Sequence, residues 1–224
     1  MKKVIVTMVV ALIATGVTLA QQEKKANLWG NVKFNSSTPG MFGGGMWSAN
    51  PSLTMTLGLN VGDFSFYAFR TNDLLDKSTN GNLIDLSISW GKKLGNWKVA
   101  LASDMMLFDN RNMDMLIPRV IGTYAKGNFS VEGMVCYCPL FKGGSMSIAR
   151  LSPAVRIEGY TFRLFIWEKY ANETFSTPMA LQISKKLFQF SNGGSVSADV
   201  AYHFRDATAK KLESWGWCSI NVNF

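Results

Sequence analysis

The sequence predicts an all-β fold: a transmembrane, antiparallel up-and-down β-barrel of about twelve strands, preceded by a signal peptide. Apolar and polar residues alternate along most of the chain, and helical spacing of apolar residues is not sustained after the leader. Tight turns alternate with longer loops, and the apolar face changes between odd and even residue numbers across each tight turn. Together these patterns indicate a series of hairpins.

The N-terminal segment has the pattern of a secretory signal peptide. A basic stretch at residues 1–3 precedes an apolar stretch at 4–17 and a small-residue cleavage pattern at 18–20. We therefore expect residues 1–20 to be removed and residues 21–224 to form the barrel. An N-terminal anchor helix is the alternative interpretation of the same segment.

The predicted strands are runs of period-two alternation bounded by turn residues. Many have a length close to the roughly 9–11 residues with which a tilted strand crosses a bilayer. The predicted ranges are 28–35, 47–60, 63–71, 83–91, 96–106, 116–125, 128–138, 146–157, 160–170, 178–188, 195–205 and 214–224.

Short and long connections alternate along the chain, as in transmembrane barrels with tight turns at one end and longer loops at the other. Tight turns are predicted at 61–62, 92–95, 126–127, 158–159 and 192–193. Across the first of these, the apolar face moves from Leu57 and Leu59 to Phe64 and Phe66. A slip of one residue would invert every face, so the repeated change of parity supports the hairpins.

Aromatic residues beside the tight turns favour a lipid-facing apolar surface over the water-facing exterior of a lipocalin-like barrel. We expect Trp90 opposite Trp97, Tyr124 opposite Phe129, and Ile157 opposite Tyr160. The predicted interface girdle therefore consists of Trp90, Trp97, Tyr124, Phe129 and Tyr160.

The chain ends on the apolar face of its last predicted strand, with Ile220, Val222 and Phe224. A terminal aromatic after alternating apolar residues resembles the C-terminal signature by which bacterial outer-membrane β-barrels are recognised for assembly. The resemblance covers residues 21–224 and identifies no subfamily. It implies a location in the bacterial outer membrane, with membrane lipid and the barrel assembly machinery as partners.

The polar face is expected to line the lumen and to be mainly basic. Arg156 should face Thr161, and Arg163 should face Ala154. The candidate pore-lining residues are Lys33, Lys98, Arg119, Arg150, Arg156, Arg163, His203 and Arg205.

Rings of Arg and Lys favour anions in pores. The expected function is therefore a narrow porin-like channel of the outer membrane that passes small solutes, with a preference for anions that arises from its basic lumen. Twelve-stranded porins that admit acidic sugars are similar in strand count and in their basic lumen tracks, although no motif assigns the chain to them. The alternative is a plugged barrel whose interior charges pair, acting as a scaffold, adhesin or assembly partner.

Enzymatic, metal and nucleic-acid functions are not expected. Outer-membrane phospholipases and lipid A deacylases carry a His-x-Ser pair, whereas His203 is followed by Phe204 and Arg205. Cys136 and Cys138 share one strand face and could ligate a soft metal, but the pattern lacks the further ligands of a zinc site. No cofactor is predicted, and the dispersed basic residues do not form a nucleic-acid-binding patch.

Overall fold

The computed structural model describes residues 26–40, 46–76, 80–111, 114–139, 144–171, 173–191, 193–204 and 214–224. The predicted signal peptide lies outside these residues. Over the described ranges, the chain contains no helix that is long and apolar enough to cross a membrane.

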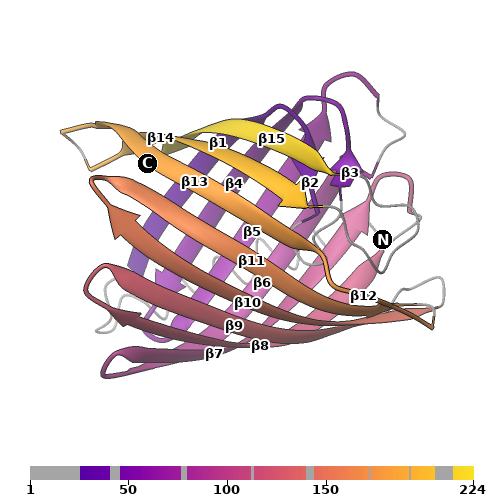
Figure 1. The fold of residues 1–224 in the computed structure, drawn as a ribbon, viewed down its shortest axis with the longest axis horizontal. Helices are drawn as coiled ribbons and strands as arrows, with labels where there is room; N and C mark the ends of the chain where they lie inside the picture. The colour runs from indigo at the N-terminus through magenta and orange to yellow at the C-terminus, as the bar shows by residue number, and fades with distance from the viewer. Residues whose placement is uncertain are drawn as a thin grey trace.

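A closed antiparallel barrel of twelve strands forms the body of the molecule (Figure 1). Each strand pairs with its neighbours along the chain, and the last strand pairs with the first to close the ring. This confirms the predicted all-β, up-and-down barrel. The strands are β1 (Ala26–Asn35), β4 (Ser52–Val61), β5 (Phe64–Asp73), β6 (Leu83–Leu94), β7 (Trp97–Phe108), β8 (Met115–Lys126), β9 (Phe129–Pro139), β10 (Ser145–Ile157), β11 (Tyr160–Ala171), β13 (Met179–Gln189), β14 (Ser195–Phe204) and β15 (Trp215–Asn223).

Three short strands lie among the longer connections. β2 (Thr38–Pro39) and β3 (Met46–Ser48) pair with each other, and β12 (Thr174–Ser176) pairs with the end of β11. The single strand predicted over 47–60 is therefore divided into β3 and β4. The gap between them covers residues 49–51 and includes Pro51, whose ring nitrogen cannot donate a ladder hydrogen bond.

The tight turns use glycine differently from the prediction. Gly62, Gly95 and Gly127 are the first central residues of two-residue turns and have φ of 58°, 61° and 58°. A type II′ hairpin turn places glycine at its first central position, so β4, β6 and β8 each extend up to the glycine. The turn at 158–159 is the predicted one, with positive φ at both residues.

These turn positions correct two predicted pairings. Trp97 pairs with Leu94 and not with Trp90, and Phe129 pairs with Lys126 and not with Tyr124. The predicted pairing of Ile157 with Tyr160 is confirmed. Both corrections shift the partner by an even number of residues, so the side chains of these two hairpins keep their predicted faces.

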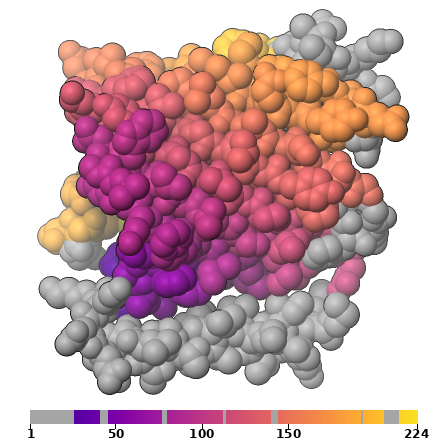
Figure 2. Space-filling view, turned by 90° about the horizontal axis from the view of Figure 1, so that it is seen from below, coloured from indigo at the N-terminus to yellow at the C-terminus, as the bar shows by residue number. Residues whose placement is uncertain are grey.

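The outward face is predominantly apolar and exposed. Figure 2 shows one side of this wall, where the side chains of successive hairpins form a continuous surface. Its large exposed residues include Leu57, Leu101, Val120, Val135, Leu151, Val200 and Ile220. Arg70 also points outward, near the end of the barrel that carries the longer loops, and its guanidinium lies 2.7 Å from the carboxylate of Asp109. We call this end the loop end and the opposite end the turn end.

Candidate functional site in the barrel interior

The barrel interior contains a buried apolar cluster and several buried polar networks, and the two share strands β5 to β10. A cluster of buried side chains from β5 to β13 lies mainly toward the loop end. Trp47 of β3 packs against it, with its ring centroid 5.5 Å from that of Phe108. This cluster occupies part of the bore and consists of Phe69, Leu83, Met106, Phe108, Met115, Ile117, Met134, Cys136, Cys138, Ile148, Trp167 and Ala180.

Arg119 on β8 belongs to a buried polar network. Its Nε lies 2.6 Å and its Nη2 2.9 Å from the two carboxylate oxygens of Asp104 on β7. The hydroxyl of Tyr67 on β5 donates to the same carboxylate at 2.8 Å. Asp104 is fully buried. The positive charge of Arg119, a candidate pore residue, is therefore balanced by a buried carboxylate inside the barrel.

Two other candidate residues are also paired. The guanidinium of Arg150 contacts Glu132 at 2.5 Å, and the ammonium of Lys33 lies 3.6 Å from Asp199. Asn221 donates a further hydrogen bond to Asp199 at 2.9 Å. The nearby carboxylates of Glu132 and Asp199 therefore offset most of the electrostatic field of Arg150 and Lys33.

Three further candidate residues differ from Lys33, Arg119 and Arg150 in having no carboxylate beside them among the described residues. We call them the turn-end basic group: Lys98, Arg156 and Arg163. In the described parts of the chain, no carboxylate lies within 4.0 Å of their charged nitrogens. Arg156 pairs with Thr161 and Arg163 with Ala154, which is the predicted register. The group lies within a few residues of the tight turns.

His203 forms part of an aromatic stack. Its ring lies 3.9 Å from that of Trp215 at an interplanar angle of 11°, and 5.8 Å from that of Trp167. Trp167 in turn stacks on Phe165 at 5.3 Å. Sequence reasoning missed this stack, because its residues come from β11, β14 and β15, and inward parity alone does not show which of them meet. Arg205 lies outside the described residues.

The aromatic residues predicted at the interface lie on the outward face beside the tight turns. The rings of Trp97 and Tyr124 contact each other with centroids 5.0 Å apart, and Lys185 donates to the hydroxyl of Tyr160 at 2.7 Å. Trp90 and Phe129 are exposed on the same face. The predicted C-terminal residues Ile220, Val222 and Phe224 are also exposed and outward-facing.

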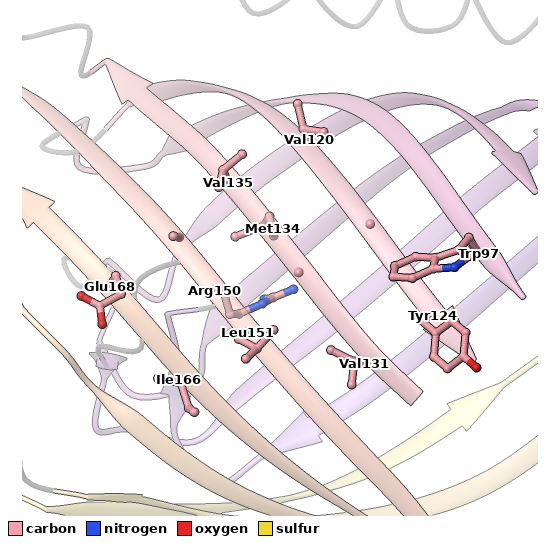
Figure 3. Close-up of a pocket in the computed structure, with 13 residues that line it drawn as sticks. Trp97, Val120, Tyr124, Val131, Met134, Val135, Arg150, Leu151, Ile166 and Glu168 are labelled. Carbon is pink, nitrogen blue, oxygen red and sulfur yellow. The ribbon is translucent and has the colours of Figure 1, made fainter. Parts of the chain in front are cut away.

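An apolar groove of about 680 Å³ lies on the outward side of β7 to β11 (Figure 3). It forms where Gly122 and Gly133 pair across β8 and β9 and leave no side chain on the wall. Trp97, Tyr124 and Leu151, which line the groove, have outward register, so the groove belongs to the outward surface of the barrel.

Comparison with known proteins supports the fold. No family model matches the sequence, and no curated protein matches it. Among solved structures, the KdgM porin aligns with a TM-score of 0.57 at 10% identity, covering 88% of this chain and 98% of that one. The NanC porin aligns with a TM-score of 0.52 at 11% identity, covering 88% and 98%.

An outer-membrane channel from Pseudomonas putida F1 aligns with a TM-score of 0.50 at 10% identity, covering 88% of this chain and 94% of that one. The chain is a closed twelve-stranded β-barrel whose fold is similar to that of these porins and this outer-membrane channel. The apolar outward face of this barrel is suited to lipid contact, and the aromatic residues near its tight turns are suited to the membrane interface.

Proposed function

We propose that the barrel is a narrow channel through which small solutes cross the outer membrane, with a preference for anions. The observation that carries this proposal is the turn-end basic group, whose three charges have no carboxylate partner among the described residues. A fixed positive charge beside an aqueous path raises the local concentration of anions.

Two further features of the interior concern the width of the bore and its charge. The buried apolar cluster and Trp47 occupy interior space toward the loop end. Three candidate pore residues, Lys33, Arg119 and Arg150, are paired with carboxylates inside the barrel. Passing ions would therefore respond mainly to interior basic side chains without a carboxylate partner among the described residues, and the turn-end basic group supplies three of these.

The test is the reversal potential of single channels in a planar bilayer under a salt gradient. The double substitution Arg156→Glu and Arg163→Glu replaces two positive charges with two negative charges beside the proposed path. We expect the reversal potential to move from anion preference toward cation preference. Leu164→Ala, on the outward face of β11, is the control and should leave selectivity unchanged.

The competing function is a barrel that does not transport and serves as a scaffold, adhesin or assembly partner. The apolar cluster and the three interior ion pairs favour it, because both fill and neutralise the lumen. Correctly folded protein without any conductance would support this function and overturn the channel. Conductance with a reversal potential indifferent to both arginines would place selectivity elsewhere in the barrel.

A further inference from the structure

Six sulfur-bearing side chains gather in the apolar cluster inside the barrel. They come from four consecutive strands, β7 to β10, and are Met106, Met115, Met134, Cys136, Cys138 and Met146. Met106 and Met115 are direct cross-strand partners, as are Cys138 and Met146. The sequence shows only the Cys-x-Cys pair, whereas the fold adds thioethers to it.

The two cysteines have the spacing of ligands to a single ion. Their Sγ atoms are 3.8 Å apart, both residues are buried, and neither is in a disulfide. A disulfide would need a separation of about 2.05 Å. With metal–sulfur bonds of about 2.3 Å, this separation subtends an angle of about 110° at a shared ion, which suits a tetrahedral or trigonal site.

The chemistry of the available donors selects a soft metal. Met146 lies opposite Cys138, and Met134 precedes Cys136 by two positions on the same strand face. Thiolates and thioethers prefer soft ions such as Cu(I), whereas carboxylates and imidazoles suit harder ones. Within the described ranges, no group of three or more His, Cys, Asp or Glu residues is placed to hold a metal ion.

Two guanidinium groups lie beside the sulfur atoms, and each is also paired with a carboxylate, so they offset the charge of an anionic complex only in part. Two thiolates and one monovalent ion carry a net charge of −1, and Arg119 is the cross-strand partner of Cys136. Arg150 lies opposite Met134 on β10. Both guanidinium groups also bind carboxylates, so they hold fixed positions beside the sulfur atoms.

We propose that the thiolates of Cys136 and Cys138, with the thioether of Met146, bind one soft monovalent ion of the Cu(I) or Ag(I) class. Each thiol gives its proton to water as its sulfur binds the ion, so two protons are released and no oxidant or reductant takes part. Cys138 is the second-to-last residue of β9 and Met146 the second residue of β10, so the site lies near the loop end. The site does not depend on whether the barrel conducts.

The test is a titration of the folded full-length barrel in detergent with Ag(I), under conditions that keep thiols reduced. We expect one ion per barrel, followed by the ultraviolet charge-transfer band of a silver thiolate and by mass spectrometry of the intact protein. Cys136→Ser and Cys138→Ser should each weaken binding of Ag(I) by more than about 100-fold. Loss of a residue that only contacts a metal ligand already lowers metal affinity by about 10–100-fold, and these variants lose a ligand itself. Met146→Leu should weaken binding by about 10-fold.

Matched controls separate this site from general thiol reactivity. Cys218→Ser removes the exposed outward cysteine, and Met105→Leu removes an outward methionine on β7; both should bind Ag(I) as the unsubstituted barrel does. Binding that survives loss of both Cys136 and Cys138, or disappears in Cys218→Ser, would overturn the proposal. A Cys136–Cys138 disulfide in protein isolated from membranes would also overturn it.

A second measurement avoids reliance on variants that fail to fold. X-ray absorption at the silver edge, recorded on the unsubstituted barrel, should show a first shell of two or three sulfur atoms. A shell of oxygen or nitrogen atoms would contradict the assigned ligands.

Discussion

The ring of the terminal residue Phe224 lies directly over Gly30 of the first barrel strand, at the seam that closes the barrel. The amide of Gly30 donates to the carbonyl of Phe224 at 2.8 Å, and the amide of Phe224 donates to the carbonyl of Gly30 at 3.0 Å. A Cβ atom added to Gly30 would overlap the Phe224 ring. The last residue therefore completes the hydrogen bonding of the seam and covers it on the lipid side.

Gly30→Ala should weaken the seam, because the new methyl group displaces the Phe224 ring. Gly133→Ala is the matched control: Gly133 also faces outward, and an added Cβ there meets nothing within 4 Å. We expect the urea midpoint of unfolding to fall for Gly30→Ala and to stay or rise for Gly133→Ala, because alanine suits strands better than glycine. If Gly30 acts through the ring, combining Gly30→Ala with Phe224→Ala should be less than additive.

Phe224→Lys should hinder assembly more than Asn223→Lys. Position 224 faces outward, and in a membrane a charge there would cost about 2–4 kcal/mol at the midplane and about 0–1 kcal/mol near an interface, whereas Asn223 faces the interior. Loss of the terminal aromatic also removes the residue expected to be recognised by the assembly machinery. The measurement is the yield of folded barrel in outer membranes; equal yields for the two variants would contradict the role of Phe224.

A closed barrel with this outward face should require detergent for extraction from membranes. It should also migrate differently on a denaturing gel before and after boiling, because strand pairing around a complete ring resists the detergent until it is heated. Cell fractionation and the gel shift are the measurements. Quantitative recovery in a detergent-free soluble fraction would contradict a lipid-facing exterior.

Asp104→Ala should destabilise the barrel far more than Asp109→Ala. Removal of Asp104 leaves the guanidinium of Arg119 buried without its main partner, which typically costs about 3–5 kcal/mol. Asp109 pairs with Arg70 on the outward surface, where both side chains are about a third exposed, and exposed ion pairs contribute about 0–1 kcal/mol. The free energies of unfolding in urea test this difference, and similar losses for the two variants would contradict it.

Anion preference arising from the turn-end basic group should weaken as salt is added. The screening length falls from about 30 Å at 0.01 M to about 3 Å at 1 M salt, so the field of Arg156 and Arg163 reaches across a narrow path only at low ionic strength. Permeability ratios measured at several salt concentrations with a fixed gradient test this expectation. A ratio independent of salt would point to a steric origin of selectivity.

Local patterns in the sequence determined the barrel and the face of most side chains; an exception is Phe188, which a register shift after Lys186 places opposite the outward-facing Val196. Side chains in a strand alternate with a period of two, and each strand pairs with its neighbour along the chain, so a hairpin needs only nearby residues to establish its two faces. Turn positions were less certain: the partner of Phe129 moved from Tyr124 to Lys126 because a type II′ turn requires glycine first. Such shifts are even-numbered and do not alter the faces.

Only the tertiary structure decided which side chains meet. Phe224 reaches Gly30, and Lys33 reaches Asp199, because ring closure brings the two ends of the chain together. The pairing of Cys138 with Met146 depends on the register of β9 and β10 across a longer loop. Whether a residue number is odd or even assigns its side chain to the interior. Its position along the barrel axis and its neighbours depend on the stagger of all the strands around the ring. For this reason the sequence alone could not separate Arg119, which is paired with Asp104, from the turn-end basic group, which has no carboxylate partner among the described residues.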